Sequence, residues 1–174
     1  MITDPWFYAV AVPAVLLVGL AKGGFGGPIA LLGVPLMSLF IPPVQAAGIL
    51  LPILVVMDIT GLLTYRSTFK APALWLLIPA AIIGIGVGWL AAAYVTNAHV
   101  RLIVGLTALV FSLDYFLNRG GRKARAKPGP RQGVFWGAVA GFTSFVAHAG
   151  GPPLAMYLLP QRLAPVLYAG TSVV

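Results

Sequence analysis

The chain has 174 residues, of which 60% are hydrophobic and only 8% are charged, with a formal net charge of +8 and no cysteine. An ordinary soluble domain carries about 25% charged residues, so this chain cannot cover a water-exposed surface. The composition excludes a soluble enzyme, a coiled coil and a disordered tail, and it predicts an all-α polytopic transmembrane protein. Without cysteine there are no disulfides or thiolate ligands, and we expect no cofactor and no metal.

The first apolar stretch belongs to the mature fold, because Met1–Pro5 carries an acid and no base, unlike a cleavable signal peptide. Trp6–Ala21 and Pro28–Ile41 are apolar but shorter than the roughly 20 residues that a membrane span needs. Between them, the glycine-rich segment Lys22–Gly27 cannot continue a helix comfortably. We therefore predict a glycine-broken, re-entrant helical pair.

Three later stretches are long and apolar enough to span a membrane, and a second glycine-rich break follows them. In the second break, His148–Gly151 separates one apolar stretch from the residues after Pro152. The three predicted spans are Val44–Tyr65, Pro72–Tyr94 and Val100–Asn118, and the stretch before the second break is Gly133–Ala147.

The positions of the basic residues predict the orientation in the membrane. Arg66 and Lys70 lie in one connection, and most other bases lie in a basic linker at 119–132. Connections rich in Lys and Arg stay on the cytoplasmic side, and two spans separate these connections. We therefore predict a multi-pass plasma-membrane protein with a cytoplasmic linker at 119–132 and an external N-terminus.

Small residues recur at nearly one offset, which predicts an internal repeat. The offset is 122 between Gly19 and Gly141 and again between Ala47 and Ala169, and Pro28 matches Pro152 at 124. The first copy would be 1–118, and the second, inverted copy would begin at 133–174. The second copy is expected to be incomplete here, lacking about three spans by this repeat logic, or to need a partner or another copy that supplies them.

The two breaks are the candidate site, since discontinuous helices in inverted repeats present half-helix N-termini to an anion. Lys22 could add a positive charge at one break and His148 at the other, although Lys22 could also snorkel and His148 could simply pack. Asp58, inside a span, could couple transport to protons or pair with Lys22. The glycines could instead serve close helix packing. The candidate substrate-binding residues are Lys22, Gly23, Gly24, Gly26, Gly27, Ser144, His148, Gly150 and Gly151.

Residues around both breaks carry a resemblance to a known family. GLAKGGFGGP at 19–28, the apolar segment that follows, and AGFTSFVAHAGGPPLAMYLLPQRL at 140–163 resemble the sulfite exporter TauE/SafE family of permeases. The resemblance implies transport of a small anion such as sulfite, a sulfonate or a related organosulfur compound. Many members have a more uniform glycine run, from which Lys22, Phe25 and His148 depart.

The leading functional prediction is a secondary transporter that moves a small anion by alternating access. An anion channel and a non-transporting assembly subunit are the alternatives. An enzyme is disfavoured, because Ser144 and His148 are the only candidate dyad and no third group orients them. Membrane lipid is an expected partner, and nucleic acid is not, since no aromatic residue is interleaved with the bases of the linker.

Overall fold

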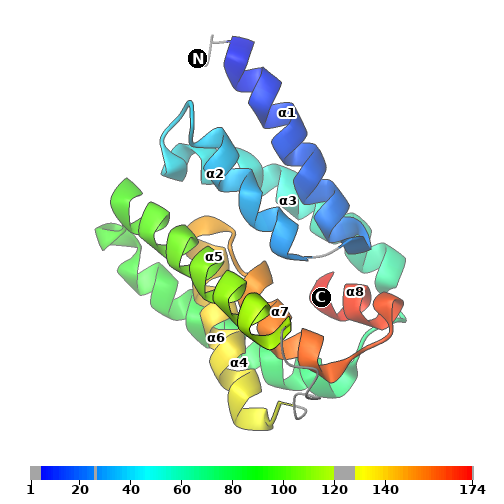
Figure 1. The fold of residues 1–174 in the computed structure, drawn as a ribbon. Helices are drawn as coiled ribbons and strands as arrows, with labels where there is room; N and C mark the ends of the chain where they lie inside the picture. Colours follow the sequence, from blue (N-terminus) through cyan, green and yellow to red (C-terminus); the bar gives the residue numbers. More distant parts are fainter. Residues whose placement is uncertain (1–4, 26, 120–127, 174) are drawn as a thin grey trace.

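The computed structural model describes residues 5–25, 27–119 and 128–173 (Figure 1). These residues are helical with short turns and contain no strand, which confirms the predicted all-α class. Within them, four helices are long and apolar enough to cross a membrane, which confirms a polytopic membrane protein. They are Pro5–Gly23, Pro43–Tyr65, Ala71–Tyr94 and Asn97–Leu117.

At the first break the α-helix ends where the break was predicted, and the chain changes its helical pitch. Helix α1 (Pro5–Leu20) continues as a π-helical turn η1 (Ala21–Phe25), and a 3-10 helix η2 (Gly27–Leu32) then leads into α2 (Gly33–Met37). With the π turn included, Pro5–Gly23 is long enough to span, so the first stretch is not too short. Single π turns inside helices occur often at functional sites.

The three long spans agree with the prediction to within three residues at each end. They are α3 (Pro43–Tyr65), α4 (Ala71–Ala91), which ends in the 3-10 turn η3 (Ala92–Tyr94), and α5 (Asn97–Arg119). Both α3 and α4 have a proline in the first turn, where its missing N–H has no helical partner to lose.

The chain after residue 128 forms a long helix, a break and two shorter helices. Helix α6 (Pro130–Ala147) precedes the break, and α7 (Gly151–Leu158), the 3-10 turn η4 (Leu159–Gln161) and α8 (Pro165–Val173) follow it. Helix α6 begins three residues before the predicted Gly133, because Pro130 occupies its first turn. Figure 1 shows α1 descending and α2 rising, whereas α6 rises and α7 descends. Most of the predicted basic linker, 120–127, lies outside the described residues.

Small residues bring α4 and α6 together along most of their lengths. Gly84 and Gly88 on α4 are buried, as are Gly137 and Gly141 on α6. A Cβ on Gly141 would stand 2.7 Å from the Cα of Ala81, so the two backbones lie in direct contact. On α6, the helix before the second break, glycines therefore serve close helix packing.

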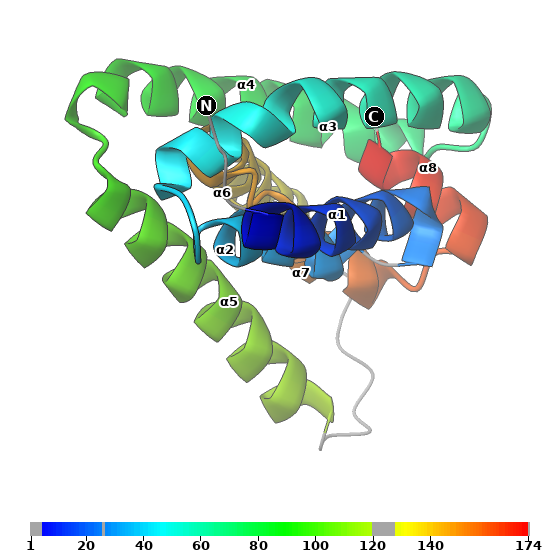
Figure 2. The ribbon, with the colours of Figure 1, turned by 90° about the horizontal axis from the view of Figure 1, so that it is seen from above.

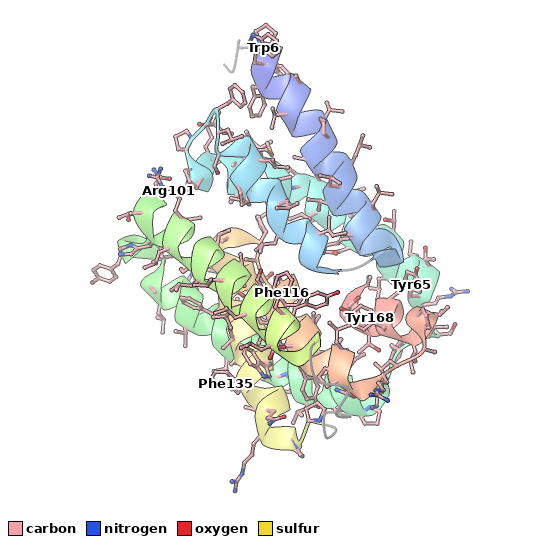
Figure 3. The ribbon with its side chains drawn as sticks, viewed as in Figure 1. Trp6, Tyr65, Arg101, Phe116, Phe135 and Tyr168 are labelled. Carbon is pink, nitrogen blue, oxygen red and sulfur yellow. The ribbon has the colours of Figure 1, made fainter. Side chains whose placement is uncertain are left out.

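The outward faces of the bundle are apolar. Helix α5 slants away from α4 after the turn that joins them and forms one edge of the molecule (Figure 2). Figure 3 shows Trp6 at the outer end of α1 and Phe116 on α5, both exposed. In water such surfaces would be unstable, but in a bilayer they face hydrocarbon, and terminal tryptophans suit the interface.

Candidate functional site

Helix α3 holds the first break by a charged contact. The ammonium group of Lys22, in the π turn, donates to Oδ1 of Asp58 on α3 and forms an ion pair with it. The hydroxyl of Tyr65, at the end of α3, donates to the backbone oxygen of Gly23 at 3.1 Å. Of the two predicted roles for Asp58, the pairing with Lys22 is present in the structure. The side chains are 30% and 44% exposed, so the pair is not sealed in the core.

The second break is held by a strained histidine. His148 ends α6 with φ 51° and ψ 31°, a left-handed conformation that costs a non-glycine residue roughly 1–2 kcal/mol. Its Nε2 lies 2.9 Å from the carbonyl oxygen of Ala47 on α3, the distance of a hydrogen bond that Nε2–H donates. At the end of α6, the backbone N–H groups of His148 and Ala149 donate to the backbone oxygens of Ser144 and Thr143, respectively. The imidazole therefore connects the break to α3.

The two breaks contact α3 at different levels. Ala47 and Asp58 are eleven positions apart, which is about 16 Å along an α-helix at 1.5 Å per residue. The short segments that follow the breaks, η2 and α7, contact each other. The side-chain contacts of the two breaks therefore fall on different turns of α3, while the segments that follow the breaks meet.

A cavity of about 510 Å³ connects the two breaks. Leucine, isoleucine, valine and alanine side chains make most of its wall, and the polar groups are few. It brings together five of the predicted site residues and Asp58. Those that line it are Lys22, Asp58, Ser144, His148, Gly150 and Gly151.

The remaining predicted residues have other surroundings. Gly23 is exposed, and no heavy atom lies within 4 Å of the place where its Cβ would stand. Gly24 belongs to the π turn and Gly27 begins η2, while Gly26 lies outside the described residues. Thr143, which precedes the candidate Ser144 and was not itself a candidate, is buried, and its hydroxyl donates to the backbone oxygen of Val139 at 2.8 Å.

Sequence reasoning missed the contribution of α8. Tyr168, Thr171 and Ser172 also line the cavity. Thr171 is 2% exposed; its Oγ1 donates to the carbonyl of Leu167 and accepts from the backbone N–H of Lys70. The sequence feature that could have indicated this contribution is the presence of three hydroxyl residues within five positions of an otherwise apolar helix.

Apolar spanning helices around a partly polar cavity, with broken helices in its wall, are typical of membrane transport proteins. The family model described as sulfite exporter TauE/SafE matches residues 11–174, and the chain belongs to that family. The family consists of membrane transporters of sulfur-containing anions rather than enzymes. No curated protein and no solved structure matches the chain.

Proposed function

We propose that this protein is a secondary transporter for a small sulfur-containing anion, sulfite or a sulfonate, in the plasma membrane. The observation that carries the proposal is the cavity, because both helix breaks line it and Lys22 is one of its lining residues. In a wall made mostly of aliphatic side chains, a single ammonium group is worth far more to an anion than it is in water. The hydroxyl of Ser144 is a second donor in the same wall.

The helix breaks offer the anion backbone as well as side chains. Gly150 precedes the first residue of α7 and has no side chain to block its N–H group. Gly151 begins the helix, where N–H groups have no intrahelical partner and the helix dipole is positive. The two breaks, at separate levels of α3, would form the two ends of the binding region. Alternating access would open one end at a time, with the N-terminus external and the 119–132 linker cytoplasmic.

The test is uptake of radiolabelled sulfite into proteoliposomes by the wild-type protein and two lysine variants. Lys22→Ala should raise the half-saturating concentration about tenfold or more, since a charge-assisted hydrogen bond contributes about 1.5–3 kcal/mol. Lys70→Ala is the matched control, because Lys70 bonds to Gln161 at 2.7 Å and does not line the cavity.

Each outcome of this test has a definite meaning. Equal and small effects of the two substitutions would remove Lys22 from the site. Absence of flux for sulfite, sulfate and simple sulfonates would refute the substrate class. Ohmic current that does not saturate would favour the channel over the carrier.

A further inference from the structure

The charge of the cavity is balanced before any anion enters. Lys22 and Asp58 pair with each other, and no other Lys, Arg, Asp or Glu is among the described residues that line the cavity. An anion that binds to Lys22 therefore competes with the carboxylate of Asp58 for the only full positive charge among the described residues that line the cavity. The displaced carboxylate would then keep a full negative charge in a largely aliphatic wall, where a charge without a partner is unfavourable.

The second break cannot compensate for two negative charges. The first turn of an α-helix attracts anions through its unpaired N–H groups. In α7, Pro152 and Pro153 occupy two of these positions, and proline has no N–H. Gly150 and Gly151 are the positions there that still have one, so this end can help to hold one anion.

The described residues that line the cavity around Asp58 supply no second fixed positive charge. The π turn contributes Lys22 itself, and on α3 the hydroxyl of Tyr65 is engaged with the backbone of Gly23. From α6, His148 lines the same cavity but its Nε2 is directed to the carbonyl of Ala47. Helix α8, which packs against both η1 and α3, contributes Tyr168 and two hydroxyl side chains and has no charged residue in Pro165–Val173.

We infer that Asp58 takes up one proton when the anion takes its place on Lys22. This inference rests on the proposed transport function and adds its coupling. The proton adds to the free carboxylate from the aqueous phase that the anion came from. When the anion leaves, Lys22 and Asp58 pair again, and the proton departs to the same side as the anion. A singly charged anion and one proton cross together, and no net charge moves.

The experiment measures the binding of methanesulfonate to the purified protein as a function of pH. This anion remains singly charged throughout, so the protein alone accounts for any pH dependence. Uptake of one proton predicts that the dissociation constant rises about tenfold for each unit of increasing pH while Asp58 is charged in the anion-free protein. Asp58→Asn should bind more tightly and independently of pH, because the competing carboxylate is gone.

Asp114→Asn is the matched control, since Asp114 is a carboxylate on another spanning helix and does not line the cavity. It should keep the wild-type pH dependence. A pH dependence retained in Asp58→Asn would overturn the inference and assign the proton to another group, with His148 the nearest in the cavity. A flat wild-type profile with clear binding would also overturn it, and would leave the transport proposal intact.

A flux measurement keeps the inference testable if Asp58→Asn fails to fold. In liposomes that contain a pH-sensitive dye, wild-type methanesulfonate uptake should acidify the interior and should not respond to an imposed membrane potential. Anion uptake without acidification, or with a current, overturns the coupling. No binding and no flux of any sulfur anion overturns the proposed function itself, and the coupling with it. The double variant Lys22→Met/Asp58→Asn keeps the cavity neutral and should bind no anion.

Discussion

Replacing Gly84 with alanine is expected to separate α4 from α6 and to destabilise the protein. A Cβ at this position would stand 2.9 Å from the carbonyl carbon of Ala138, closer still to the oxygen, and 2.9 Å from the backbone nitrogen of Phe142. Real Cβ atoms essentially never lie that close to a neighbour. The obstacles are backbone atoms, so no side-chain rotation can relieve the collision, and the helices must move apart.

The magnitude follows from two opposing effects. Overpacking costs about 1–3 kcal/mol, and collisions with backbone atoms of two residues favour the upper end of that range. Alanine is better than glycine in a helix by about 0.5–1 kcal/mol, which offsets part of the cost. We expect a net loss of about 2 kcal/mol, which for a chain of this size lowers the melting temperature by about 4–8 °C.

Gly86 provides the control on the same helix, since no atom lies within 4 Å of the place where its Cβ would stand. Gly86→Ala should therefore be neutral or slightly stabilising. The assay is thermal unfolding of both variants in one detergent, followed by tryptophan fluorescence. If Gly84→Ala melts at or above the temperature of Gly86→Ala, the argument from close backbone contact is refuted.

Two further predictions concern the second break and α8. His148→Ala loses the bond to Ala47 and keeps the left-handed strain, whereas His148→Gly loses the same bond but relieves the strain. In thermal unfolding, the glycine variant should therefore be more stable than the alanine variant by about 1–2 kcal/mol. The reverse order of stability would contradict a strained break. Gly170→Ala should lower the melting temperature, since its Cβ would stand 2.8 Å from the carbonyl carbon of Thr68, while Gly48→Ala has open space and should not. Equal melting temperatures for these two variants would count against a close contact of α8 with the 66–70 turn.

The long helices could be predicted because the length of an apolar run is enough to indicate a membrane span. A run of about 20 apolar residues has few alternatives in a chain this poor in charge. The pairing of Lys22 with Asp58 was also predicted, since isolated charges inside a membrane protein need a partner. The place of these residues relative to the polar connections was enough to infer both the spans and the ion pair.

The geometry of the breaks could not be predicted in the same way. Glycine permits many backbone conformations, and the contact between Tyr65 and Gly23 accompanies the π turn that the chain adopts. The offset of the two breaks along α3 depends on how neighbouring helices slide against each other, which no local pattern encodes. For the same reason the hydroxyl residues of α8, such as Thr171, were not assigned to the cavity.

Pro52 gives α3 a mechanical property that follows from its position. It lies inside the helix, between Ala47, which contacts the second break, and Asp58, which holds the first. A proline there has no N–H to bond to the carbonyl of Gly48, so the helix lacks one backbone hydrogen bond between the two contacts. Bending of α3 at Pro52 therefore costs less than bending elsewhere along the helix, and this point separates the segment that contacts the second break from the segment that contacts the first.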